Sequence, residues 1–257
     1  MSDSSYEMLV RDTFRPAEIS VSHQPVEPPR SADLAAHVDA NWRARKAAAA
    51  SAGVTLTNGH LLRLASFEAR PQHLSLELGN TRYADFLATN ADAPTRAALP
   101  WQQLANPLGT SALILTADGH CVLGLRGGAV LLHQGYVHTI GGMFEAEDLI
   151  DGHVHATGSI LREAREELGI EDAQVTTVRC RGLMRDTENL QPELMFELSV
   201  DLDTETLERH WQTAPSRHEH VSLVSIPGDP KSLRAYLTEG HPLAPQARAA
   251  LELRLAP

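Results

Sequence analysis

The stretch REAREELGI (162–170) constrains the fold more than any other part of this sequence. It joins strong helix formers to a glycine and an isoleucine, which is typical of a helix end with an apolar anchor. At about 100° of rotation per residue, three carboxylates share one face of that helix: Glu163, Glu166 and Glu167. Three apolar residues fall on an adjoining face: Leu161, Ala164 and Leu168. The sequence therefore predicts a helix that packs through one side and presents acids on another.

Two interpretations of the acidic face are open at this point. Arg162 and Arg165 could form salt bridges with the acids, which would make this an ordinary solvated helix surface. Alternatively, the clustered carboxylates hold a hard divalent cation through oxygen ligands. The preceding segment TIGGMFEAEDLI favours the cation, because Gly141 and Gly142 at a strand end allow the backbone to turn sharply and approach a ligand.

Composition narrows the classes of function. The chain has 257 residues, of which 42% are hydrophobic and 21% charged, as is ordinary for a globular protein. Its formal net charge of −11 argues against a nucleic-acid partner, because phosphate backbones bind basic surfaces. Two cysteines, Cys121 and Cys180, are too few for a disulfide framework, so we expect a reduced, cytoplasmic chain. The N-terminus does not read as a signal peptide, and no apolar run is long enough to span a membrane.

The pattern of strands and helices predicts two units. Residues 1–105 form an N-terminal α+β module, whose first ~30 residues are polar, proline-rich and loosely ordered. Within it we expect short strands near 6–10 and 17–22, a helix at 31–50, a strand pair around Arg70-Pro71 and a short helix or turn at 81–90, before a linker at 100–109. Residues 106–257 form an α/β domain with a hairpin around Asp118-Gly119, the Glu-rich helix, strands at 175–184, 194–200 and 221–226, and helices at 203–211 and 244–254.

The Glu-rich helix and its approach resemble the Nudix hydrolase box, Gly-x5-Glu-x7-Arg-Glu-U-x-Glu-Glu-x-Gly-U, where U is aliphatic. Residues 162–170 match its second half, with only Ala164 smaller than usual. The first half departs from the box, since the acid six residues after Gly142 is Asp148, and the spacing from it to Arg162 is longer than in the box. We predict that the additional length, within 143–158, is a mobile or ligand-facing loop outside the core.

The resemblance implies a Nudix α/β/α sandwich with a mixed sheet, and Mg²⁺-dependent hydrolysis of a diphosphate linkage, with Mn²⁺ as a substitute. Mg²⁺ neutralises phosphate oxygens and acidifies water, and rigid helical carboxylates can hold it. The implied metal site contains Glu163, Glu166, Glu167 and Gly142. The implied catalytic residues are Glu163, Glu166, Arg162, which orients a carboxylate, and Glu219, an acid in the loop SRHEH. Gly141 and Gly142 are expected at the substrate, with Gly142 offering a carbonyl to the metal.

The resemblance extends beyond the box to the animal Nudix hydrolases that split UDP-glucose and UDP-galactose. Its blocks are LGNTRYADFLATN (78–90), NPLGTSALILTADG (106–119), the box and SRHEH (216–220). It implies products UMP and a sugar 1-phosphate. The Nudix helix handles only the diphosphate, so base selection is expected elsewhere, with Tyr83 and Asn90 as candidates for stacking and pairing. The alternative is that 78–90 only closes the N-terminal fold.

Other residues have two interpretations each. Arg126 ends a strand and is expected to reach substrate phosphate, although a surface position is as compatible with the sequence. Four histidines lack the spacing of a zinc site and are expected on surface loops: His153, His155, His218 and His220.

Three function classes remain. The first is a nucleotide-sugar diphosphatase, the second a hydrolase of ADP-ribose or another nucleoside-diphosphate-linked substrate, and the third a degenerate Nudix domain that only binds a nucleotide. The intact set of glutamates opposes the third. The expected partner is a small nucleotide diphosphate, without nucleic acid or membrane, and a homodimer is an expected assembly because many Nudix proteins dimerise.

Overall fold

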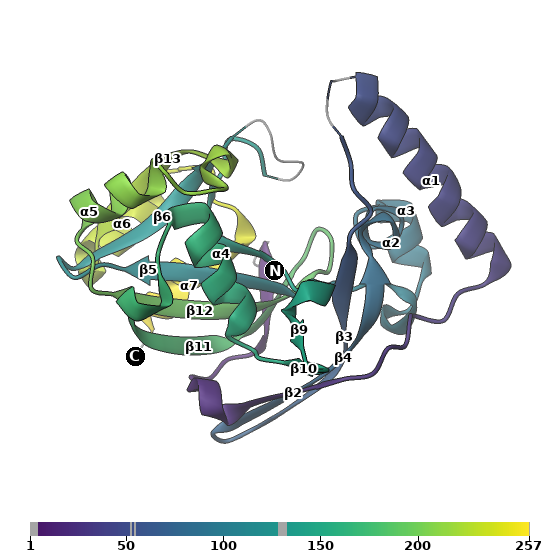
Figure 1. Cartoon of the computed structure of the whole chain (residues 1–257), viewed down its shortest axis with the longest axis horizontal. Coiled ribbons are helices and arrows are strands. Elements are labelled where there is room, and N and C mark those ends of the chain that lie inside the picture. The colour runs from purple at the N-terminus through teal and green to yellow at the C-terminus, as the bar shows by residue number, and fades with distance from the viewer. Residues whose placement is uncertain (1–4, 52, 54, 128–132, 257) are drawn as a thin grey trace.

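The apolar runs around 110–126 and 175–200 form the centre of a large mixed sheet (Figure 1). The computed structural model describes residues 5–51, 53, 55–127 and 133–256. In spatial order, the strands of this sheet are β1 (Tyr6–Val10), β11 (Val175–Asp186), β12 (Pro192–Val200), β5 (Gly109–Leu115), β6 (His120–Arg126) and β13 (His220–Pro227). Among the described residues of this sheet, β12 and β5 are the one parallel pair. Two short strands extend it: β7 (Val137–His138) on β6 and β8 (Ile140–Met143) on β5.

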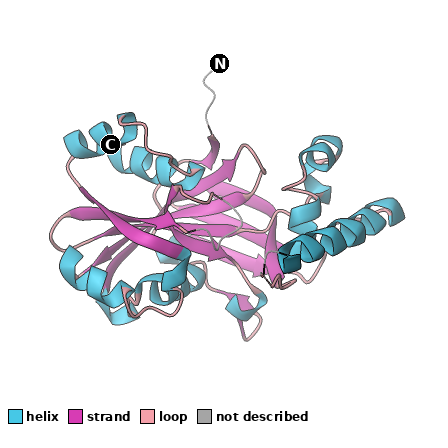
Figure 2. Cartoon of the chain, turned by 90° about the horizontal axis from the view of Figure 1, so that it is seen from above, coloured by secondary structure: helices cyan, strands magenta, loops and turns pink. Residues whose placement is uncertain are grey.

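Helices cover both faces of this sheet, as the Nudix sandwich requires (Figure 2). The helices are α4 (Gly158–Leu168) with α5 (Thr204–Trp211) on one face, and α6 (Pro230–Thr238) with α7 (Pro245–Leu255) on the other. Successive residues of β5 enter different cores, since Ala112 and Ile114 belong to the core that contains Ile160 of α4, and Leu113 to that of α7. A strand buried on both faces explains why 109–115 is almost continuously apolar. The α/β/α prediction is confirmed.

Helix α4 ends as its sequence predicts. Gly169 has a left-handed φ of 68°, and the next residue, Ile170, is 1% exposed. The packing face differs by one position from the expectation. Ile160, Ala164 and Leu168 are fully buried, whereas Leu161 is only partly covered.

The N-terminal half forms a second, smaller sheet with its own helices. Its strands are β2 (Ile19–His23), β4 (His73–Arg82) and β3 (His60–Arg70), and its helices are α1 (Ala32–Ser51), α2 (Tyr83–Ala88) and α3 (Ala93–Ala98). Short 3-10 turns complete the chain at Pro16–Glu18, Trp101–Gln103, Ala146–Asp148, Asp172–Gln174 and Arg217–Glu219. Val38 of α1 packs against Ala84 and Ala88 of α2.

The two sheets share one hydrophobic core. Leu62 and Leu76 of the small sheet belong to the same buried cluster as Ile160 of α4. Buried Arg63 of β3 donates hydrogen bonds to the carbonyls of Gln102, Leu104 and Ala105, so the expected linker is anchored. Within residues 5–30, β1 is hydrogen-bonded to β11 of the large sheet, and β2 pairs with β4 of the small sheet. The division of the chain into two units at residue 105 stays a prediction. Strand β1 comes from the N-terminal side of that boundary but pairs with β11 of the large sheet.

Part of the 143–158 insertion lies in the core, which corrects the expectation of a loop wholly outside it. The expected ligand-facing position has support, because Glu145 and Glu147 line the cavity described below. The insertion forms a small hairpin of β9 (Leu149–Ile150) and β10 (His153–Val154), and β10 contacts β2. Val154 is 6% exposed and belongs to the shared core. The polar and glycine residues suggested a loose loop, but the few apolar side chains between them fill the space between the two sheets.

No helix in the described part of the chain is both long and apolar enough to cross a membrane.

Candidate active site

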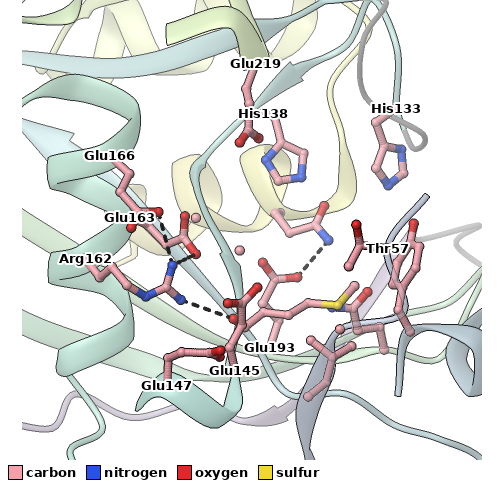
Figure 3. Close-up of a pocket in the computed structure, with 18 of the residues that line it drawn as sticks. Thr57, His133, His138, Glu145, Glu147, Arg162, Glu163, Glu166, Glu193 and Glu219 are labelled. Atoms are coloured by element: carbon pink, nitrogen blue, oxygen red, sulfur yellow. Dashed lines mark hydrogen bonds and ion pairs between the residues drawn. The ribbon is translucent and has the colours of Figure 1, made fainter. Parts of the chain in front are cut away.

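A cavity of about 780 Å³ opens between α4 and the small sheet (Figure 3). Both sheets contribute to its walls, with Leu61 from β3 of the small sheet and Gly141 and Gly142 from β8 of the large sheet. Tyr83 of α2 and the acidic face of α4 also line it. Of the predicted site residues, eight line it: Tyr83, Arg126, Gly141, Gly142, Arg162, Glu163, Glu166 and Glu219. Glu167 and Asn90 do not appear in its lining.

Arg162 organises the acids of α4. Its Nη1 lies 3.0 Å from Glu163 Oε1 and 3.2 Å from Glu166 Oε2, and its Nε lies 3.2 Å from Asp148 Oδ1. These contacts place Arg162 where the sequence predicted, beside the carboxylates that it would orient. Asp148 is the acid six residues after Gly142, and it reaches Arg162 despite the longer spacing because the inserted hairpin folds back against the small sheet.

Glu163 is a buried carboxyl beside other acids, and this environment favours its neutral, protonated form. It is 8% exposed, and burial, followed by repulsion from Glu167, raises its pKa to about 8. Gly142 permits this position, because a Cβ on Gly142 would lie 2.3 Å from Glu163 Oε1. Closely spaced carboxyl oxygens beside the Gly142 backbone are suitable ligands for a divalent cation, because the cation would offset their mutual repulsion.

The acids are not arranged as a closed metal cage. Within the described ranges, no three His, Cys, Asp or Glu side chains converge closely enough to coordinate one ion. Arg162 contacts both Glu163 and Glu166, while Glu167 is turned toward His220. The donor chemistry fits a divalent cation, and the side chains would need to rotate to bind it.

Glu167 points behind the cavity. Its Oε1 accepts from the backbone N–H of Gly141 at 3.1 Å, and its Oε2 lies 2.6 Å from His220 Nε2. Burial raises the pKa of Glu167 and lowers that of His220 to about 4, so both neutral forms are favoured and one proton joins them. The prediction of a surface position was wrong for His220, which is 3% exposed, whereas His153, His155 and His218 are exposed.

Arg126 and Glu219 lie on the cavity at the β6 and β13 side. Their closest atoms, Nη2 and Oε2, are 3.8 Å apart, which is a loose pair. The Nε of Arg126 is buried without a hydrogen-bond partner among the described residues. This arrangement leaves a guanidinium available to an anionic group in the cavity.

The cavity also has buried polar residues in its lining that were not predicted from the sequence. Glu193 of β12 is 4% exposed, and its neighbours there include His138, Gln191 and Gln246. A signal for Glu193 was available, because a glutamate inside the apolar run PELMFELSV is rare without a partner or a function. Gln246 carries no such signal, since it lies near the start of an ordinary helix.

Of the two residues predicted from the 78–90 block, Tyr83 lines the cavity and Asn90 does not. Tyr83 lines the cavity, and burial raises the pKa of its hydroxyl. Asn90 is 0% exposed and is engaged by protein groups, because it donates to the carbonyl of Asn189 at 3.0 Å and to Asn106 Oδ1 at 3.1 Å. The substrate contact predicted for Asn90 is therefore not supported, and its visible role is to position Asn189, which lines the cavity.

Comparison with known proteins gives one named group of relatives. No protein-family model matches the chain. The uridine diphosphate glucose pyrophosphatase NUDT22 of Bos taurus is 29% identical over 206 residues, covering 70% of each chain. The protein of the same name from Homo sapiens is 27% identical and covers 65% of this chain, which spans 63% of the human protein. These relatives confirm the predicted resemblance to the Nudix hydrolases of this kind.

Solved structures that match part of the chain are less similar in sequence. The crystal structure of DR0079 from Deinococcus radiodurans is 18% identical, covers 61% of this chain and 85% of its own, and has a TM-score of 0.41. A NUDIX-family hydrolase from Clostridium perfringens is 14% identical, covers 59% and 97%, and has a TM-score of 0.36.

Proposed function

We propose that this chain hydrolyses the diphosphate linkage of a nucleotide sugar in a Mg²⁺-dependent reaction, with UDP-glucose or UDP-galactose giving UMP and a sugar 1-phosphate. The observation that carries the proposal is the cavity in which Glu163, Glu166 and Glu219 face the same space as Arg126. The relatives are pyrophosphatases by name, in agreement with the predicted hydrolase activity on phosphoanhydride bonds.

The contacts of each side chain suggest its role in the proposed reaction. Glu163 and Glu166 would hold the cation, which would supply charge neutralisation and a more acidic water. Arg162 keeps both carboxylates directed toward the cavity. Arg126 lines the cavity, and its guanidinium binds a phosphate oxygen there. Glu219, held only loosely by Arg126, accepts the proton of the attacking water.

The choice of UDP-sugars has separate support. The relatives act on uridine diphosphate glucose by name. Tyr83 of α2 lies on the cavity wall, where an aromatic ring can stack on a base. The cavity volume of about 780 Å³ is in the range of ordinary pockets for small-molecule ligands.

The test is a hydrolysis screen of the full chain with UDP-glucose, UDP-galactose, ADP-glucose and ADP-ribose, in Mg²⁺, Mn²⁺ or EDTA, with products identified by mass. Glu166→Gln should lower kcat by about 100-fold or more, because an oxygen ligand is replaced. Glu171→Gln is the matched control, since Glu171 pairs with Arg165 just beyond the same helix, outside the cavity lining.

The outcomes separate the alternatives. Turnover of UDP-sugars that EDTA abolishes and Glu171→Gln preserves would support the proposal. ADP-ribose cleaved at least tenfold more efficiently than UDP-glucose would refute the UDP-sugar assignment. Nucleotide binding without cleavage in either metal would instead identify a binding protein.

A further inference from the structure

Three buried polar side chains from distant parts of the sequence line one wall of the cavity. They are His138 of β7, Glu193 of β12 and Gln246 of α7, which are 6%, 4% and 5% exposed. We call them the acceptor wall. None of them belongs to α4 or to the 78–90 block, so neither the diphosphate chemistry nor the small sheet explains why polar groups are buried here.

Glu193 is held in a defined orientation. Ser111 Oγ donates to its Oε1, and Gln246 Nε2 donates to its Oε2 at 2.8 Å. Thr139 Oγ1 in turn donates to Ser111 at 2.8 Å. Each carboxylate oxygen has two lone pairs, so one donor per oxygen leaves capacity for a ligand in the cavity.

The carboxylate of Glu193 also determines the orientation of Gln246. When Glu193 is ionised, its oxygens only accept hydrogen bonds, so the amide nitrogen of Gln246 faces them and Gln246 Oε1 lies on the other side of the amide. That oxygen is buried and has no hydrogen-bond partner among the described residues. An unpartnered buried acceptor is unfavourable, and a donor on a ligand would satisfy it.

His138 presents a third acceptor for the same kind of reason. Its Nδ1 lies 2.7 Å from the carbonyl oxygen of Thr139, and because a carbonyl only accepts, Nδ1 carries the proton. Burial lowers the pKa of His138 well below its usual range, so the ring is neutral. Its Nε2 is then a lone-pair acceptor on a ring that lines the cavity.

We propose that the acceptor wall is a subsite for the hydroxyl groups of the sugar ring next to the diphosphate. Neighbouring hydroxyls offer several donors close together, which is what three acceptors require. A phosphate offers only acceptors and negative charge, which ionised Glu193 would repel. A uracil edge offers one N–H between two carbonyls, which does not match the wall. The inference rests on the proposed function, and names the part of a nucleotide sugar that this wall binds.

The test compares kcat/KM for UDP-glucose with kcat/KM for analogues lacking one hydroxyl, on the hexose or on the ribose. In the wild type, the analogue that lacks a wall-bound hydroxyl should lose about 10- to 100-fold. Glu193→Gln and Gln246→Leu should each cut that discrimination to about threefold or less. Glu197→Gln is the matched control, because Glu197 is equally buried in β12 but pairs with Arg181 outside the cavity lining.

The ratio between substrates is the decisive quantity. A variant that is merely misfolded lowers the parent and deoxy substrates together and leaves their ratio unchanged, whereas loss of the subsite changes the ratio. The ring whose analogue discriminates identifies ribose or hexose as the occupant. Unchanged ratios for every analogue in both variants would overturn the subsite.

If UDP-glucose is not cleaved, the proposed function fails separately from the subsite. The same ratio is then measured as dissociation constants for UDP-glucose and its deoxy analogues in EDTA, by calorimetry. Equal dissociation constants for parent and all deoxy analogues in the wild type would overturn the subsite regardless of catalysis.

Discussion

The buried carboxyl of Glu193 should make the stability of the protein depend on pH in a direction opposite to that of a salt-bridged acid. Burial raises its pKa to about 7 from a value of 4.5 in the unfolded chain. The folded state therefore binds the proton more tightly, and the free energy of unfolding falls as pH rises through this interval. Complete ionisation at pH 8, compared with pH 5, corresponds to a loss of roughly 2 to 3 kcal/mol.

Glu193→Gln removes this titration while keeping a side chain of the same shape. The Gln amide can accept from Gln246 and donate to Ser111, whose hydroxyl rotates. The difference in unfolding free energy, variant minus wild type, should therefore rise by roughly 2 to 3 kcal/mol between pH 5 and pH 8. Urea denaturation at four pH values across this range measures it. A difference that stays constant within about 0.5 kcal/mol, which is ordinary for surface substitutions, would show that Glu193 does not gain a raised pKa on folding.

Three further predictions concern packing around the cavity. Gly142→Ala places a Cβ 2.3 Å from Glu163 Oε1, so we expect kcat to fall by about tenfold or more with retained folding, measured by steady-state hydrolysis and circular dichroism. Asn90→Ala removes the donor to the Asn189 carbonyl, and should lower the unfolding free energy by about 1 to 3 kcal/mol in urea titrations; an unchanged midpoint would contradict this. Val154→Ala should cost about 1 to 3 kcal/mol by the same assay, because Val154 lies in the shared core, whereas a loop outside the core would lose less than about 0.5 kcal/mol.

Local features of the sequence determined much of this protein. The spacing of acids in 162–170 predicted α4 and placed Glu163 and Glu166 at one cavity, and Gly169 ends the helix as expected. The strand pair around Arg70-Pro71 and the hairpin around Asp118-Gly119 also form. These features succeed because helix periodicity, turns and caps depend on residues only a few positions apart.

The tertiary structure decided what those local elements face. The same periodicity that put Glu167 with the other acids could not show that His220 lies 2.6 Å away behind the cavity. Nor could it show that β1 pairs with β11, or that Val154 fills the space between two sheets. The acceptor wall joins His138, Glu193 and Gln246 from three elements. A sequence pattern indicates which face of an element is apolar. The partner that packs against that face depends on the packing of the whole chain. A site built from distant elements is therefore visible only in the tertiary structure.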